Sequence, residues 1–272
     1  MLADRNRRPP TPFCNAGDAS CFYPSASHQE ALARLHFLVR QGRSLGILTG
    51  SEGSGKSLVL ARFLGELHQA GLPVCLLNLT GLDPRDFLWE LAARLRARPG
   101  ADDSEFTLWR QVSDRIRAHH LLRARPTILL DDADEAAQEV LTVVLRLLKS
   151  QPGLATLVLA VDGERLPRLG GSLLHLSPLR MHLEPWDLGD LRQYLQTSLA
   201  RAGGDPRRFD DAAVTRLHAL SDGLPRWAVH LAELAWLAAE GEGQDRITAD
   251  TVESAYQALS ATYLAGPLGY AA

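Results

Sequence analysis

Five short apolar runs, separated by segments with helical spacing, occupy the chain up to residue 184. Each run is long enough for one buried strand, and the runs cover residues 45–50, 74–79, 127–130, 154–161 and 181–183. Between them, apolar residues recur at helical spacing in residues 58–67, 84–98, 105–123 and 136–149. Strands that alternate with helices in this way predict an α/β domain built on a parallel sheet.

The pattern changes after the last apolar run. From Trp186 to Leu259 the spacing is helical throughout, with turn-forming sequences at residues 203–206, 223–225 and 241–243. We therefore expect three parts: a disordered tail at residues 1–12, an α/β domain at 13–184 and a small all-helical domain at 185–272. With 272 residues, the chain can bury a sizeable core.

A phosphate-binding pattern follows the first apolar run. Residues 50–57 (GSEGSGKS) fit G-x-x-x-x-G-K-[ST] at every fixed position, and Lys56 is one of two lysines beside 27 arginines. Glycines let backbone N–H groups face a phosphate, and the next helix directs its positive end to the same place. Lys56 would contact the β- and γ-phosphates, and the Ser57 hydroxyl would ligate Mg²⁺. The predicted nucleotide-binding residues of this loop are Gly50, Ser51, Glu52, Gly53, Ser54, Gly55, Lys56, Ser57 and Leu58.

Two adjacent carboxylates end the third apolar run. Residues 127–130 (TILL) lead directly into Asp131 and Asp132, the arrangement of a Walker B motif. At the carboxyl end of a strand beside the phosphate loop, Asp131 would hold Mg²⁺ through water, and Asp132 would orient or deprotonate the attacking water. The alternative is that the two acids only cap a turn at the end of a strand.

Three further acidic residues need separate interpretations. We expect Asp134 and Glu135 to be the N-cap and a first-turn acid of the helix at residues 136–149. Asp162 follows the fourth apolar run, and turn formation explains it at least as well as the role of γ-phosphate sensor, which a polar residue at this strand end has in ATPases that these motifs resemble.

Composition limits the classes of function. The formal net charge of −3 argues against a generally basic nucleic-acid-binding protein, but arginines cluster at residues 94–125 and form either a solvated helical face or a local basic patch. No stretch reaches the ~18 apolar residues that a membrane-spanning helix needs, and no signal peptide is evident, so we expect the cytoplasm. Cys14, Cys21 and Cys75 give neither a disulfide framework nor a zinc spacing.

With these motifs in place, the chain resembles AAA+ ATPases of the ExeA/GspA type, general-secretion-pathway ATPases with an origin-recognition-type helical lid. The resemblance rests on residues 27–32 (SHQEAL), the phosphate loop, the Asp131–Asp132 pair and residues 222–226 (DGLPR). It implies a P-loop NTPase fold with a three-layer parallel sheet and a helical lid. It also implies that Arg226 reaches the nucleotide phosphates as sensor 2, and that the region of Phe22, Tyr23 and His28 contacts adenine. An arginine suits the sensor role because its guanidinium is always charged and can bind phosphate in a bidentate manner.

This sequence departs from the family pattern at two places. The second Walker B acid is usually glutamate, whereas Asp132 is one methylene shorter, and Asp-Asp is the usual ending in STAND nucleotide switches. The trans-acting arginine of the family has no clear match, since His175 and Leu176 occupy its place and Arg168 and Arg180 are displaced candidates. Hydrolysis can therefore be slow.

Three functional hypotheses follow. The first is an AAA+ ATPase that hydrolyses ATP with Mg²⁺, with Lys56, Asp132 and Arg226 in catalytic roles and Ser57 and Asp131 at the metal, and that couples nucleotide state to lid movement and partner remodelling. The second is a slow-turnover nucleotide switch of the STAND kind. The third is a DNA-associated loader related to transposition and replication ATPases. We expect ATP or ADP as ligand and a homo-oligomer or a protein partner; the net charge does not indicate DNA.

Overall fold

The computed structural model describes residues 11–13 and 22–265, with side chains through residue 260. These residues form two compact units, one of residues 24–184 and one that combines the described residues before Pro24 with those from Pro185 onward. Most of the predicted tail at residues 1–12, together with Cys14 and Cys21, lies outside the described residues.

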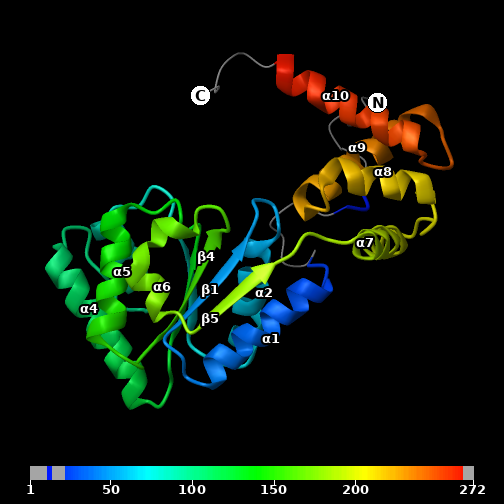
Figure 1. Cartoon of the computed structure of the whole chain (residues 1–272). Coiled ribbons are helices and arrows are strands. Elements are labelled where there is room, and N and C mark those ends of the chain that lie inside the picture. Colours follow the sequence, from blue (N-terminus) through cyan, green and yellow to red (C-terminus); the bar gives the residue numbers. More distant parts are fainter. Residues whose placement is uncertain (1–10, 14–21, 266–272) are drawn as a thin grey trace, which may run out of the picture. The chain divides into compact units, whose positions relative to one another are not determined.

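The first unit is built on a five-stranded parallel sheet in the order β2-β3-β4-β1-β5. The strands are β1 (Leu45–Gly50), β2 (Val74–Asn78), β3 (Thr127–Asp131), β4 (Thr156–Asp162) and β5 (Leu179–Leu183). Gly50 is in register with Asp162 on β4 and Leu183 on β5, and Asn78 is in register with Asp131. Figure 1 shows the strand ends pointing toward one edge, so these residues share the carboxyl edge where open α/β sheets bind ligands.

Helices cover both faces of the sheet. Figure 1 shows α1 and α2 on one side and α4, α5 and α6 on the other, where their apolar residues join the main core cluster with α3. The elements are α1 (Ala26–Arg40), α2 (Lys56–Gln69), α3 (Pro84–Arg94), α4 (Glu105–Leu121), α5 (Gln138–Ser150), the 3₁₀ helix η2 (Leu166–Leu169) and α6 (Gly170–Leu176). The predicted three-layer P-loop fold is confirmed.

Most differences from the predicted elements lie at helix ends. Asp83 caps α3 and Pro84 is its first residue, but α3 ends at Arg94, whereas the helical spacing of the sequence extends to residue 98. The expected N-cap role of Asp134 is wrong, because α5 starts at Gln138 with Ala137 at its N-cap. The Asp134 side chain instead accepts a hydrogen bond of 3.0 Å from the backbone N–H of Asp162.

The second unit is all-helical in its regular elements, which are α7 (Leu188–Arg201), α8 (Asp211–Ser221), α9 (Pro225–Glu242) and α10 (Ala249–Ala265). Asp187 and Asp210 cap α7 and α8 through side-chain hydrogen bonds. Phe13 stacks on Tyr194 and meets Phe209 edge-on, so this residue packs with the helical unit although the predicted boundary assigns it to the α/β domain. None of the described helices combines the length and apolar character that crossing a membrane requires.

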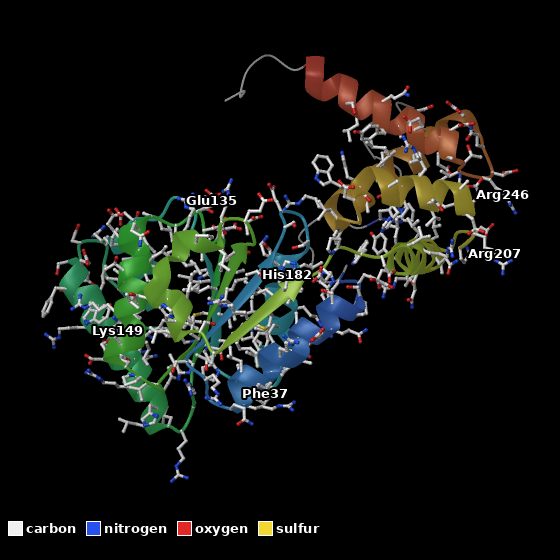
Figure 2. The ribbon with its side chains drawn as sticks, in the orientation of Figure 1. Phe37, Glu135, Lys149, His182, Arg207 and Arg246 are labelled. Carbon is white, nitrogen blue, oxygen red and sulfur yellow. The ribbon has the colours of Figure 1, made fainter. Side chains whose placement is uncertain are left out.

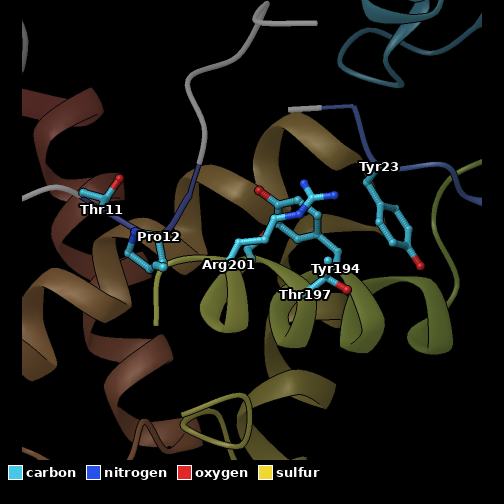
Figure 3. Close-up of a pocket in the computed structure, with 8 residues that line it drawn as sticks. Thr11, Pro12, Tyr23, Tyr194, Thr197 and Arg201 are labelled. Carbon is cyan, nitrogen blue, oxygen red and sulfur yellow. The ribbon is translucent and has the colours of Figure 1, made fainter. Parts of the chain in front are cut away.

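A small pocket opens on the helical unit beside α7. Its lining includes Thr11, Pro12, Tyr23, Tyr194 and Arg201 (Figure 3). Tyr23 packs edge-on against Trp186 and Tyr194, and its hydroxyl donates to Gln193 at 3.0 Å. Burial, followed by the charges of Asp190 and Asp187, raises the pKa of Tyr23 to about 12. This tyrosine, predicted to lie near adenine, belongs to the aromatic core of the helical unit.

Candidate functional site

The phosphate loop joins β1 to α2 at the carboxyl edge of the sheet. Gly53 and Gly55 have φ angles of 82° and 98°, a left-handed region that residues with a Cβ rarely adopt. Lys56 begins α2 and is 9% exposed, and its Nζ donates to the carbonyl oxygens of Gly50 at 2.8 Å and Ser51 at 3.1 Å. Among the described residues Lys56 forms no salt bridge, although its charge lowers the pKa of Asp131, so the ammonium can also contact a bound anion.

Close packing explains the first glycine of the loop. A Cβ on Gly50 would lie 2.5 Å from Ser54 Oγ and 3.1 Å from Leu183 Cβ. The Ser54 hydroxyl is buried and has no hydrogen-bond partner within the described part of the chain. An unsatisfied hydroxyl beside a buried cation fits a loop that is completed by a polar ligand.

His28 of α1 contacts the backbone of the phosphate loop. It is 2% exposed in α1, its Nε2 lies 3.0 Å from the Ser54 carbonyl oxygen, and its Nδ1 lies 2.5 Å from Ser25 Oγ. A Cβ on Gly55 would lie 2.7 Å from the same Nε2. In a trans peptide the C=O and N–H groups point in opposite directions. Because His28 binds the Ser54 carbonyl oxygen, the N–H of Gly55 in the same peptide points away from His28.

The carboxylate pair lies on the neighbouring part of the same edge. Asp131 is 6% exposed, and burial raises its pKa, against the lowering effect of a hydrogen bond from Ser57, while the charge of Asp132 raises it further. Asp132 adopts a left-handed φ of 50°, and its Oδ2 accepts from Asn78 Nδ2 at 2.7 Å. The structure thus brings together Ser57 and the two acids that the sequence assigns to metal and water.

Sequence reasoning did not find the roles of Asn78 and His28, although each had a signal. Asn78 is a polar residue at the end of a buried strand that pairs with the strand of Asp131. His28 belongs to the buried stripe of α1 with Ala31, Leu35 and Leu38, so a polar side chain there requires a buried partner. In both cases the partner lies far away in the sequence.

The remaining acids hold the end of β4. Arg165 forms ion pairs with Glu135 and, at 3.8 Å, with Asp134. Asp162 accepts a hydrogen bond of 2.9 Å from the N–H of Glu164, which is the turn-forming interpretation of this residue. Glu135 lies in the segment between β3 and α5, and His182 lies in β5. Figure 2 shows both residues on the carboxyl side of the sheet.

The predicted arginines occupy three separate places. Arg226 is the second residue of α9 in the helical unit and is exposed. Arg168 is exposed on η2, and Arg180 on β5 donates to the Leu174 carbonyl at 3.1 Å. The sensor and trans-acting roles of these arginines stay predictions.

The geometry is that of a P-loop phosphate-binding site. A glycine-rich cradle with a buried lysine fits a phosphate chain, and the hydroxyl of Ser57 and the carboxylate of Asp131 are oxygen ligands of the kind that Mg²⁺ prefers. Residues 39–169 match the AAA domain family. These residues are therefore an AAA domain.

The chain as a whole is similar to general secretion pathway protein A of Aeromonas hydrophila, with 28% identity over 243 residues. This similarity covers 87% of the present chain but 44% of the relative, so the chain spans less than half of that protein's length. The resemblance to ATPases of the ExeA/GspA type is confirmed.

Solved structures agree on the fold. Cdc6p of Pyrobaculum aerophilum superimposes with a TM-score of 0.70 at 17% identity, over 90% of this chain and 72% of that one. The ORC1 protein of Aeropyrum pernix, solved in complex with DNA, gives a TM-score of 0.65 at 23% identity, over 87% and 66% of the two chains. The RuvB Holliday junction branch migration motor of Thermotoga maritima gives 0.61 at 16% identity, over 89% and 72%.

Proposed function

We propose that this protein binds ATP with Mg²⁺ between the phosphate loop and the carboxylate pair and hydrolyses it to ADP and phosphate. The observation that carries the proposal is the convergence of Lys56, Ser57, Asp131 and Asp132 on one edge of the sheet. A bound Mg²⁺ would offset the negative charge of the β- and γ-phosphates. Ser57 and Asp131 would hold the ion, with Asp131 acting directly or through water.

The residues of the chain then have distinct tasks. Lys56 stabilises the charge that develops on the phosphate oxygens, and the loop N–H groups hold the phosphates in place. Asp132 orients the attacking water and accepts its proton, while the Asn78 amide restrains this carboxylate at 2.7 Å. We further propose that Arg226 adds positive charge from the helical unit, which would link nucleotide state to lid position and to the remodelling of a partner.

A slow nucleotide switch is the second candidate, and Asp132 favours it. Its side chain is short, its backbone is left-handed, and its carboxylate is already bound by an amide donor. Positioning of water is sensitive to displacements of about 1 Å, so these features would reduce turnover while leaving binding intact. In such a protein the output would be a contact with another copy or another protein, for which the exposed Arg168 and Arg180 are candidates.

The test is steady-state ATP hydrolysis and nucleotide affinity of the wild type, Lys56→Ala, Asp132→Asn and Asp132→Glu. Lys149→Ala, which removes the chain's other lysine from the exposed end of α5 (Figure 2), is the matched control. An ATPase predicts turnover that both Lys56→Ala and Asp132→Asn abolish. A switch predicts tight binding with little turnover and a gain in Asp132→Glu.

Absence of nucleotide binding by the folded wild type would refute both candidates. Duplex DNA is included as a third arm because one structural neighbour was solved with DNA. Stimulation of turnover by DNA, with a steep loss of the effect as salt rises, would instead support the loader hypothesis.

A further inference from the structure

The C-terminal ends of α3 and α4 meet at the edge of the sheet opposite the phosphate loop. Arg115 Nε on α4 donates to the carbonyl oxygen of Leu95, the C-cap of α3, at 3.0 Å. The segment after α4 leads directly into β3, and Arg125 in it donates to the Ala155 carbonyl, just before β4, at 2.8 Å. The two helix ends are thus anchored where the strands begin.

Arginines occupy left-handed backbone positions at this edge. Arg96 and Arg123 have φ angles of 62° and 54° and follow the C-caps of α3 and α4, and Arg98 has a φ of 56°. The corresponding positions after the C-caps of α1, α2 and α7 are glycines, namely Gly42, Gly71 and Gly203. A side chain with a Cβ costs roughly 1 kcal/mol or more in this conformation, so arginine here needs a reason other than the turn.

The charge of this edge is uncompensated. Residues 91–101 and 115–130 contain no aspartate or glutamate. Arg94, Arg96, Arg98 and Arg123 are exposed, and none forms an ion pair with a carboxylate within residues 22–260. Burial, followed by the charges of Arg115 and Arg96, lowers the pKa of His119, as expected in a positive potential.

Two leucines project from the same place. Leu121 and Leu122 are 83% and 77% exposed, more than any other large apolar side chain in the described part of the chain. Cations at a helix C-terminus are favoured by the helix dipole, which accounts for some of the arginines. The dipole explains neither the left-handed arginines nor a pair of leucines left in water.

We propose that this arginine–leucine edge, formed by Arg94, Arg96, Arg98, Leu121, Leu122 and Arg123, docks on the anionic surface of a lipid bilayer. The leucines would enter the interface between headgroups and acyl chains, and the guanidinium groups would bind lipid phosphates. A nucleic acid would use the arginines, but it could take up the leucine pair only by unstacking base steps, a cost that a bilayer interface does not impose. Docking through this edge leaves the opposite, nucleotide-binding edge accessible.

The experiment measures sedimentation of the full chain with vesicles of phosphatidylcholine containing phosphatidylglycerol, and with vesicles of pure phosphatidylcholine. The variants are Arg96→Gly/Arg123→Gly and Leu121→Ser/Leu122→Ser. Arg207→Gln/Arg246→Gln removes the same charge from exposed positions of the helical unit (Figure 2) and is the control. Urea unfolding of each variant is measured in parallel.

We expect binding that requires phosphatidylglycerol and weakens with salt. At about 1 kcal/mol for each basic residue near an anionic surface, the double arginine variant should partition about thirtyfold more weakly, and the control should be unchanged. The glycine variant should be at least as stable as the wild type, because glycine relieves the left-handed strain. A folding defect therefore cannot mimic the result.

Several results would overturn the proposal. They are a wild type that does not bind anionic vesicles, binding that the leucine variant retains in full, and equal losses in the control. Salt-sensitive binding to duplex DNA that persists in the leucine variant, without vesicle binding, would assign the edge to nucleic acid instead.

Discussion

Substitution of His28 tests the idea that the phosphate loop is held in shape by α1. His28→Ala removes the contact of Nε2 with the Ser54 carbonyl at 3.0 Å and that of Nδ1 with Ser25 at 2.5 Å. Each buried hydrogen bond contributes about 1 kcal/mol, and the abandoned carbonyl adds a penalty, so the free energy of unfolding should fall by about 2–4 kcal/mol. Nucleotide affinity should fall as well, because the Ser54–Gly55 peptide is free to rotate.

The loss in His28→Ala should depend on pH. Burial lowers the pKa of His28, against the raising effect of its hydrogen bond to Ser54, so the folded protein takes up this proton less readily than the unfolded chain. The stabilisation is complete above the unfolded pKa of about 6.5 and declines as the pH falls below it. The difference in unfolding free energy between wild type and His28→Ala should therefore be smaller at pH 5.5 than at pH 7.5.

Urea unfolding followed by circular dichroism at the two pH values gives both quantities. His36→Ala is the control. This histidine is also in α1 and lies 2.8 Å from Glu66, but 32% of its side chain is exposed. Its removal should lower the free energy of unfolding by less than about 1 kcal/mol. His28→Gln, which keeps a donor that does not titrate, should recover part of the affinity without the pH dependence. A cost for His28→Ala equal to that of His36→Ala, or a difference that grows at low pH, would refute the reasoning.

Three further substitutions probe the carboxyl edge. Gly50→Ala places a Cβ 2.5 Å from Ser54 Oγ and should cost about 1–3 kcal/mol of stability and weaken nucleotide binding, measured by denaturation and titration. Asn78→Ala frees the Asp132 carboxylate and should change the rate of hydrolysis more than the affinity for ATP. Burial raises the pKa of Asp131, so its charged form lowers the free energy of unfolding, and this penalty is fully present above the raised pKa. Asp131→Asn removes the charge, so the free energy of unfolding of the nucleotide-free protein should rise by on the order of 1 kcal/mol at neutral pH. The same variant should lose its Mg²⁺-dependent stabilisation by nucleotide, and an unchanged response to Mg²⁺ would contradict the metal assignment.

The fold could be predicted because its signals are local. A buried parallel strand appears as a continuous apolar run, and the phosphate loop appears as one contiguous pattern, so β1, the loop and α2 were found together. Helix ends were harder to predict, because a side chain that could cap a helix can instead accept a hydrogen bond from another part of the chain. Asp134 has the sequence position of a cap, yet its carboxylate accepts a hydrogen bond from the backbone N–H of Asp162 on the adjacent strand.

The site was predicted only as far as its parts are contiguous in sequence. Lys56, Ser57 and the Asp131–Asp132 pair lie on motifs, whereas Asn78 and His28 act through atoms 54 and 26 residues away. Such pairings depend on strand order and on which face of α1 is buried. Neither can be obtained from spacing in a single sequence.

Backbone conformation adds a signal that spacing does not contain. In the described part of the chain, the residues other than glycine with positive φ are Arg96, Arg98, Arg123, Asp132 and Asp222. Asp132 is the proposed water-orienting acid, and Asp222 precedes Gly223, whose Cβ would lie 2.3 Å from the Trp186 carbonyl in the turn that leads to Arg226. Because such a residue costs free energy that glycine would not, and arginine costs more than aspartate, we infer that the side chain contributes an interaction outside the local turn. The same reasoning that singles out Asp132 therefore applies to the three arginines at the opposite edge, and the Arg96→Gly/Arg123→Gly variant tests it directly.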